Sequence, residues 1–172
     1  MQDRDEEVGH SAKLPLQIWM RMLVCTNVVL AQLRQRVREE FGITMPVFDL
    51  LTQVHRPPEG PTLRELSDRL MVSKGNITEL TDRLERKGLI ERVPDPNDGR
   101  AQRVFLTQVG RDLVERMEPA HQAWVREIMA QHDQDSLHEL YRVLGTFKVG
   151  LPSTRHRSGQ GRSARSRKEK TS

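Results

Sequence analysis

The sequence predicts a mainly α-helical protein with one small β-hairpin. Three observations lead to this fold class. Apolar residues recur at helical spacing over long stretches near both ends, two short capped segments lie close together in the middle, and a turn-rich segment separates two short strand-like runs. A length of 172 residues favours one domain with appendages. Because aromatic residues make up only 4% of the chain, we expect a core of aliphatic side chains and methionine.

The N-terminal part is expected to form a short arm and then a long helix. Residues 1–13 are polar and charged without an apolar period, which predicts a flexible arm. A helix is predicted over 14–41, where apolar residues from Trp19 to Phe41 share one face and a second apolar row repeats every seven residues. Two apolar rows favour contact with a partner chain as well as with the helix's own core.

The positive charge is concentrated at the C-terminal end. Residues 153–172 contain seven basic residues and one acidic residue, a net charge of +6, whereas the rest of the chain contains 21 basic and 23 acidic residues, a net charge of −2. We expect a disordered basic tail over 151–172. Evidence that the folded part binds nucleic acid must therefore come from local patterns rather than from the isoelectric point.

Other patterns argue against several classes of protein. The acidic N-terminus differs from a signal peptide, and no uninterrupted apolar run approaches the roughly 18 residues of a membrane span. Cys25 is the only cysteine, and we expect a buried, unreactive thiol. These features predict a cytoplasmic protein without a membrane partner. No nucleophile–base set, phosphate-binding loop or metal-ligand spacing is found, so no enzyme activity, metal or cofactor is predicted.

The most informative segment is 62–106, which begins with two short helices. Thr62 starts the first helix, and Glu65 three residues later completes a capping box. A three-residue connection then leads to a second helix, which Ser73 caps and Gly88 ends. Helices joined so tightly cross at a steep angle, which is the helix-turn-helix arrangement.

A β-hairpin is predicted directly after the second helix. Strand candidates lie at 89–93 and 101–106, and the segment between them, PDPNDGR, consists of residues that favour turns. A hairpin in this place forms the wing of a winged helix-turn-helix. Further helices are predicted over 107–149.

The second helix of such a unit enters the DNA major groove with its N-terminus first. Asn76 can donate to and accept from adenine, and Lys74 can contact guanine or a phosphate. Gly75 costs about 1 kcal/mol of helix propensity, which favours close approach to a base edge, although simple tolerance of glycine near a helix end is the alternative. The candidate DNA-contacting residues of this helix are Ser73, Lys74, Gly75, Asn76, Thr78 and Arg83.

The predicted wing supplies arginines. Arg100 lies at its tip and Arg103 on the return strand, and arginine fits the strongly negative minor groove. We expect Asp98 to hold the Arg100 guanidinium and the turn, with a surface ion pair worth about 0–1 kcal/mol as the alternative. Asp98, Arg100 and Arg103 are therefore also candidate DNA-binding residues.

Four motifs connect this segment with a known family. They are LS…L-x-VS over 66–73, T…DRLExxGLIxR over 78–92, DPxDxR over 95–100 and LTxxG over 106–110. In these motifs the stretch 63–110 closely resembles the MarR family, the multiple antibiotic resistance regulators, and the flanking helices extend the resemblance to about 14–150. Two residues depart from the family pattern: Glu79 stands where a basic or small residue is commoner, and Gly99 replaces an arginine often found just before Arg100, which weakens the charge of the wing. An acid at position 79 costs affinity for DNA unless Glu79 contacts cytosine N4 or pairs with Arg83.

The resemblance implies an obligate homodimer formed through helices 14–41 and 107–149. It implies that two recognition helices occupy successive major grooves of a palindromic double-stranded DNA site while Arg100 enters the minor groove. It also implies control by a small molecule, often an aromatic acid, bound where the dimerisation helices meet the helix-turn-helix. Candidate residues for that pocket, with core packing as the alternative for the first and fourth, are Trp19, Met22, Thr26, Phe48, His55 and Arg111.

The function predicted from the sequence is that of a sequence-specific, ligand-responsive transcription repressor. Two alternatives stay open. In one, the basic tail dominates affinity and the protein is a sequence-tolerant architectural DNA binder. In the other, the winged fold serves protein interaction without DNA binding.

Overall fold

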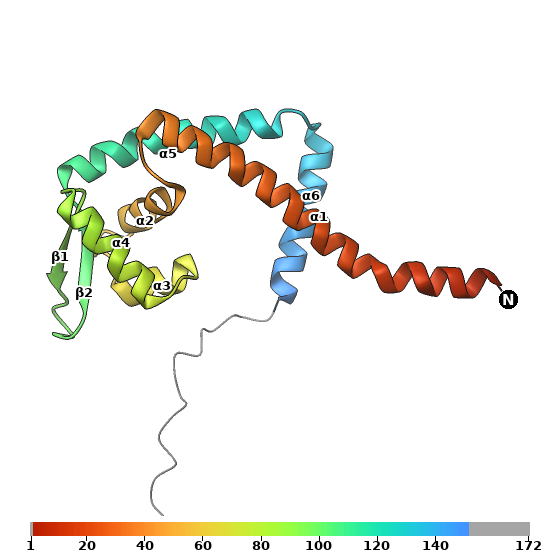
Figure 1. The fold of residues 1–172 in the computed structure, drawn as a ribbon, viewed down its shortest axis with the longest axis horizontal. Coiled ribbons are helices and arrows are strands. Elements are labelled where there is room, and N and C mark those ends of the chain that lie inside the picture. The colour runs from red at the N-terminus through yellow and green to blue at the C-terminus, as the bar shows by residue number, and fades with distance from the viewer. Residues whose placement is uncertain (1, 152–172) are drawn as a thin grey trace, which may run out of the picture. The chain divides into compact units, whose positions relative to one another are not determined.

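Residues 2–151 are described by the computed structural model, with side chains from residue 13 onward. They form a mainly helical fold with a two-stranded antiparallel sheet, so the predicted fold class, a winged helix-turn-helix between longer helices, is confirmed (Figure 1). Apart from Leu151, the predicted basic tail lies outside the described residues. The elements in order are α1 (Gln2–Phe41), α2 (Met45–His55), α3 (Leu63–Leu70), α4 (Lys74–Arg86), β1 (Ile90–Pro94), β2 (Gln102–Leu106), α5 (Gln108–Met129) and α6 (Gln134–Gly150).

The chain divides into two compact units, 1–133 and 134–172. The first contains α1 to α5 and the hairpin. The described part of the second is α6, which has no buried residue. Its larger apolar side chains recur at helical spacing: Leu137, Leu140, Tyr141, Leu144 and Phe147.

Helix α1 begins at Gln2, whereas a flexible arm was predicted over 1–13. Acidic residues near the start of the sequence, among them Asp3 and Glu6, favour a helix N-terminus because they complement the helix dipole. At the other end, Gly42 has a φ of +65° and the helix ends at Phe41, as predicted.

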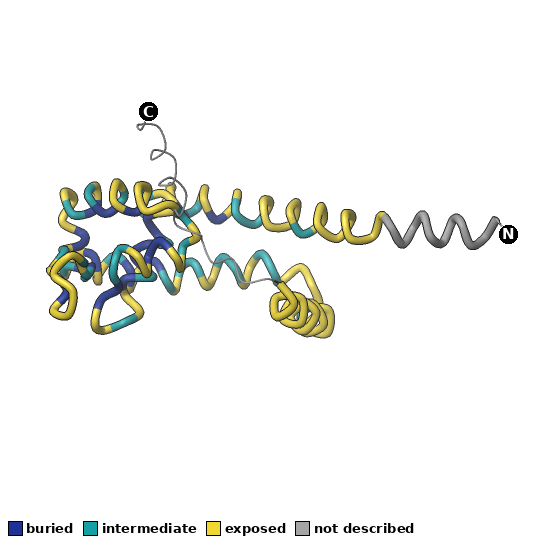
Figure 2. Tube along the Cα trace, turned by 90° about the horizontal axis from the view of Figure 1, so that it is seen from below, coloured by how far each residue is buried: buried dark blue, intermediate teal, exposed yellow. Residues whose placement is uncertain are grey.

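The two halves of α1 differ in burial, as Figure 2 shows. Near the C-terminal end, Leu33 and Val37 are buried against α2 and α5, and Arg36 bonds both carboxylate oxygens of Glu127 at 2.6 and 2.8 Å. Further toward the N-terminus large apolar side chains are exposed, and so is Cys25, contrary to the predicted buried thiol. No other element of the first unit covers that half of the helix.

The part of α1 from Lys13 to Phe41 is long and apolar enough to cross a bilayer, with a mean hydropathy of 1.4 over an 18-residue window. No uninterrupted apolar run marks it, because polar residues such as Gln17 and Asn27 are interspersed, although only Arg21 is charged between residues 14 and 31. Core helices of soluble proteins and signal sequences reach the same hydropathy, and no residue of this window is buried in the structure. The last turns of α1 are buried in the first unit's core.

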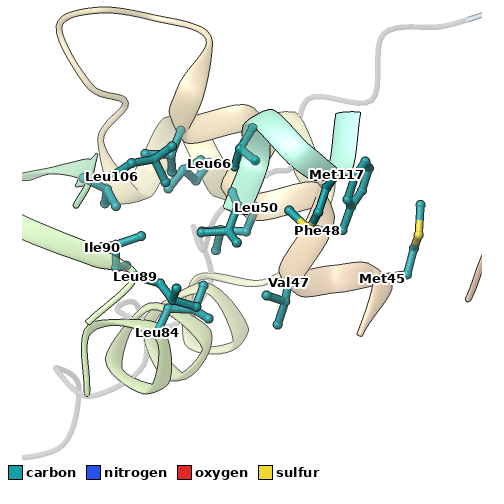
Figure 3. Close-up of a cluster of buried hydrophobic side chains, with 14 of the residues drawn as sticks. Met45, Val47, Phe48, Leu50, Leu66, Leu84, Leu89, Ile90, Leu106 and Met117 are labelled. Atoms are coloured by element: carbon teal, nitrogen blue, oxygen red, sulfur yellow. The ribbon is translucent and has the colours of Figure 1, made fainter. Parts of the chain in front are cut away.

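The core of the first unit is built around α2, which is buried on most of its circumference. Aliphatic side chains from α3, α4, both strands and α5 meet it, and Figure 3 shows this cluster. Each helix and strand contributes apolar residues at the spacing of its own secondary structure. The α3–α4 helix pair and the hairpin therefore share one core with α2 and α5. Buried members of this cluster are Val47, Phe48, Leu50, Leu66, Leu84, Ile90, Leu106 and Met117.

Local capping follows the sequence closely. The Thr62 hydroxyl accepts from the Glu65 backbone N–H at 3.2 Å, and the Glu65 carboxylate accepts from the Thr62 N–H at 2.7 Å, which is the predicted capping box. The Ser73 hydroxyl caps α4 as predicted. Thr44 stands at the N-cap of α2, but its side chain makes no capping bond.

Candidate nucleic-acid interface

The connection between α3 and α4 is a tight turn fixed by backbone geometry. Met71 adopts a left-handed conformation with φ of 54°, and the Val72 N–H donates to the Ser67 carbonyl at 3.2 Å. The buried Ser67 hydroxyl donates to the Val72 carbonyl at 2.7 Å. The buried Ser67 side chain therefore gives a carbonyl of the turn a hydrogen-bond donor. This bond helps to fix the angle between α3 and α4.

Helix α4 has one buried side and one exposed side. Ile77, Thr81 and Leu84 face the core at helical spacing, and the Thr81 hydroxyl donates to the Ile77 carbonyl at 2.8 Å. The opposite side, including Gly75 and Glu79, is exposed. This leaves a full helix face free along the first three turns.

The predicted DNA-contacting residues of α4 fall into two groups. The Ser73 hydroxyl accepts from the Asn76 N–H at 3.3 Å, and the Thr78 hydroxyl donates to the Lys74 carbonyl at 2.9 Å, so both hydroxyls serve the helix itself. The side chains of Lys74, Asn76 and Arg83 are exposed and make no recorded hydrogen bond or ion pair with a described residue. These three are available to a ligand.

Asp95 organises the wing, a role that was not assigned from the sequence although the residue belongs to the DPxDxR motif. One carboxylate oxygen accepts from the backbone N–H groups of Asn97 and Asp98 at 2.7 and 3.1 Å. These bonds, together with the Arg103 guanidinium, hold the Asp95 pKa below its ordinary value, with the bond from Asn97 contributing most. The sequence does contain a signal for this role. An aspartate that precedes the amides of a turn by two and three residues is the pattern of an Asx-turn.

Arg103, predicted among the DNA-contacting arginines, has a structural role in this unit that was not predicted. Its Nε lies 2.7 Å from the second Asp95 oxygen, and its Nη1 donates to the Gly60 carbonyl at 2.8 Å. Thr62 and Arg103 also form a β-bridge. The guanidinium therefore ties the wing to the loop before α3.

Arg100 remains free at the wing tip. The Asp98 carboxylate accepts from the Arg100 backbone N–H at 3.0 Å, so it shapes the turn through the main chain and not through the predicted contact with the guanidinium. The exposed Arg100 side chain makes no recorded hydrogen bond or ion pair with a described residue. In Figure 1 the hairpin stands beside α4.

Wing and helix pair enclose a surface hollow of about 560 Å³. Arg64 of α3, Lys74 of α4 and Arg100 of the wing bring three cationic side chains to its wall, together with Thr78 and Gln102. Arg64 was not singled out from the sequence because only the fold brings it beside residues 10 and 36 positions away. Asp95 and Asp98 also line the hollow, but their carboxylates accept bonds from backbone amides of the wing, so the three free cations are the groups that could contact a DNA backbone.

Comparisons with known proteins agree with this geometry. A family model described as the MarR family matches residues 43–101. An uncharacterised HTH-type transcriptional regulator from Bacillus cereus is 30% identical over 127 residues, which cover 72% of this chain and 83% of that protein.

The chain belongs to the MarR family.

Two further similarities support this assignment. The transcriptional activatory protein BadR of Rhodopseudomonas palustris is 29% identical over 151 residues, 84% of this chain and 86% of BadR. The crystal structure of a cysteine-to-serine variant of Escherichia coli MarR, complexed with operator DNA, has 28% identity and a TM-score of 0.65, and the match covers 77% of this chain and 93% of that one. The protein is thus a MarR-family DNA-binding transcription regulator.

One family motif explains how the wing is joined to α4. Arg92 of β1 forms ion pairs with Asp82 at 2.6 Å and with Glu85, both on α4. The bond from Arg92 is the main cause of a lowered Glu85 pKa. The acidic residues of the DRLExxGLIxR motif therefore clamp the first strand of the wing to the recognition helix.

The candidate effector residues are not all brought together. Phe48 is buried with its ring centroid 4.7 Å from that of His121, and Arg111 donates to the Leu106 carbonyl at 2.6 Å. Trp19 is exposed, so the alternative of core packing holds for Phe48 alone. Met22, which is half-buried, and Thr26, which is exposed, share a face of α1 with Trp19, whereas the exposed His55 stands at the end of α2.

Proposed function

We propose that this MarR-family regulator recognises a palindromic operator as a homodimer and represses transcription in the cytoplasm. The observation that carries the proposal is that some side chains of α4 and the wing are free to contact DNA while others are bonded within the protein and hold the wing. Lys74, Asn76 and Arg100 are exposed and free for DNA, whereas Asp95 and Arg103 hold the wing in place. Preorganised contacts lose less entropy on binding.

Dimer formation is supported by the apolar surface of this chain. Large side chains over the N-terminal half of α1 are exposed, among them Leu16, Trp19 and Val24, and so are Tyr141 and Phe147 of α6. Exposed apolar surface of this extent marks an association site. Two identical chains joined by a two-fold axis would place their recognition helices on a two-fold-symmetric DNA site.

The direct test is a titration of the full chain against DNA from its own upstream region, by fluorescence anisotropy at physiological salt with excess unrelated duplex. We expect binding that survives competition and falls by roughly 5- to 100-fold in Asn76→Ala or Arg100→Ala. Arg116→Ala, an exposed arginine on α5, is the matched control. Binding that unrelated duplex abolishes would instead support the architectural alternative. Arg100→Ala without effect on DNA affinity would support the interaction module.

Repression is proposed because occupancy of promoter DNA by a dimer is sufficient to block a polymerase. One relative, BadR, is named an activatory protein, so the direction of regulation needs its own measurement. Transcription in vitro from a template that contains the operator should fall when the protein is added. A rise would reverse this part of the proposal.

Ligand control is proposed at a pocket of about 350 Å³ beside α4. Leu70, Val72 and Leu80 supply apolar walls, and Asn76 and Arg83 of the recognition helix line it too, as do two acids, Asp49 and Glu79. Arg83 is the only basic residue among the described ones that line it, so an anionic ligand would have to bind at the Arg83 end. A guanidinium beside apolar walls suits an aromatic carboxylate. Because Asn76 is also a proposed DNA contact, an occupant would compete with the operator.

Salicylate is a suitable probe for this pocket. Calorimetric titration into the DNA-free protein should give saturable binding that Arg83→Gln weakens and Arg100→Gln leaves unchanged. Equal effects of the two substitutions would show only a general attraction of anions.

A further inference from the structure

Glu79 occupies the centre of the exposed face of α4. Buried Ile77 and Leu84 define the opposite face, and successive residues of an α-helix are separated by about 100°. Position 79 consequently points away from the core, directly above Gly75 on the preceding turn. The residue opposite the buried face of α4 is therefore an acid.

The Glu79 carboxylate has no partner among the described residues. The other two acids of α4, Asp82 and Glu85, both form ion pairs with Arg92. Pairing with Arg83, the alternative considered from the sequence, does not occur: the recorded ion pairs of the described chain include neither Glu79 nor Arg83. Glu79 thus contributes no contact that stabilises the fold, while its charge opposes any approach to phosphates.

Gly75 provides the space that Glu79 would need. A Cβ built at position 75 would meet only the Ser73 hydroxyl at 4.0 Å, and the glycine has no positive φ. Neither packing nor backbone conformation in this chain requires glycine there. Its absent side chain instead opens the surface one turn before Glu79, so the helix can enter the groove deeply enough for a carboxylate to contact a base.

We propose that Glu79 is a specificity-determining residue that accepts a hydrogen bond from the N4 amino group of a cytosine in each operator half-site. In the major groove only cytosine and adenine present an amino donor, and adenine places the N7 acceptor beside it, which repels a carboxylate. Guanine and thymine offer acceptors at the corresponding position. An unpaired carboxylate therefore selects a C·G pair, while Asn76 and Lys74 contribute other contacts. This inference rests on the sequence-specific DNA binding proposed above.

Selection of operators from a random duplex pool tests the inference. The full wild-type chain should enrich a two-fold-symmetric site with a cytosine fixed at one position of each half. Glu79→Gln should relax or shift that preference toward adenine, because an amide can donate to N7 as well as accept. We expect the preference for cytosine at that position to fall by roughly 5- to 100-fold, with the other positions unchanged.

Glu115→Gln, the same substitution at an exposed position of α5, is the matched control and should select the wild-type site. Binding to unrelated duplex should be equal or tighter for Glu79→Gln, since a negative charge is removed near phosphates. An unchanged site for Glu79→Gln, or an enriched wild-type site without a fixed C·G pair, would overturn the role of Glu79 and leave specific binding intact. Enrichment of no sequence by the wild type would overturn both proposals.

Discussion

Folding and DNA binding are expected to favour different residues at position 75: alanine would stabilise α4, whereas glycine allows closer approach to DNA. A Cβ at this position meets open space, so Gly75→Ala should raise the free energy of unfolding by about 0.5–1 kcal/mol. The same methyl group would face the DNA, so the affinity for the operator should fall. Urea unfolding and anisotropy on one preparation measure the two effects. If stability and affinity rise together, no base edge comes close to position 75.

Asp95 gives the wing a pH dependence whose sign follows from its lowered pKa. The carboxylate contributes stability above the ordinary aspartate pKa of about 3.9, and this contribution is lost as the pH falls through the lower pKa of the folded state. Asp95→Asn keeps an oxygen acceptor for the Asn97 N–H but cannot pair as an anion with Arg103. The variant should be less stable than the wild type at pH 7, and the difference should shrink in acid. Urea unfolding curves from neutral pH to below pH 3 measure this, and a difference that is constant with pH would contradict it.

At the scale of elements, Arg92 should couple the stability of the wing to that of α4. Its side chain has 19% of its surface exposed and its guanidinium pairs with two acids, so Arg92→Ala should cost about 1–2 kcal/mol, between the values for surface and buried charged bonds. Hydrogen exchange of the β1 and β2 amides should accelerate more than that of α2. Arg116→Ala, exposed on α5, should change neither quantity. Uniform acceleration across all elements would mean that Arg92 stabilises only the fold as a whole.

Local chemistry explains which elements were predictable from the sequence. The capping box of Thr62 and Glu65, the Ser73 cap and the glycine stops involve residues a few positions apart, so spacing alone identified them. Residue type and spacing are not always sufficient even for a helix cap. Thr44 stands at the N-cap of α2 without a side-chain capping bond, and the proline at the start of that helix leaves fewer amide donors to cap.

Contacts between distant residues could not be read from spacing. Arg103 reaches the Gly60 carbonyl 43 positions away, a structural contact that spacing along the sequence does not indicate. The pocket beside α4 joins residues of α2, α3, the turn and α4, and it contains none of the predicted effector residues, which lie on α1, α2 and α5. The motifs identified the family because they combine both kinds of residue, those that hold the wing and those that are free to contact DNA.

For the whole molecule, the exposed apolar surface of α1 predicts that folding and DNA binding depend on association. Leu16→Asp combined with Leu23→Asp places two charges on positions that are 62% and 38% exposed in the single chain, so the first unit's own core is untouched. A dimer would have to bury those charges, and the variant should therefore sediment as a monomer. Its affinity for a two-half-site operator should fall by roughly 10²–10⁴-fold, because the second half-site no longer benefits from linkage.

Sedimentation of the double variant measures its oligomeric state, and anisotropy measures its affinity for the operator, so the two together test that prediction. The wild-type melting temperature should rise with protein concentration, as expected when subunit binding stabilises the native state, and the variant should lose this dependence. Gln122→Asp, which adds a charge at an exposed polar position of α5, should keep both the dimer and the affinity. A double variant that remains dimeric with unchanged operator affinity would place the dimer interface elsewhere, and the apolar stripe of α6 would be the next surface to substitute.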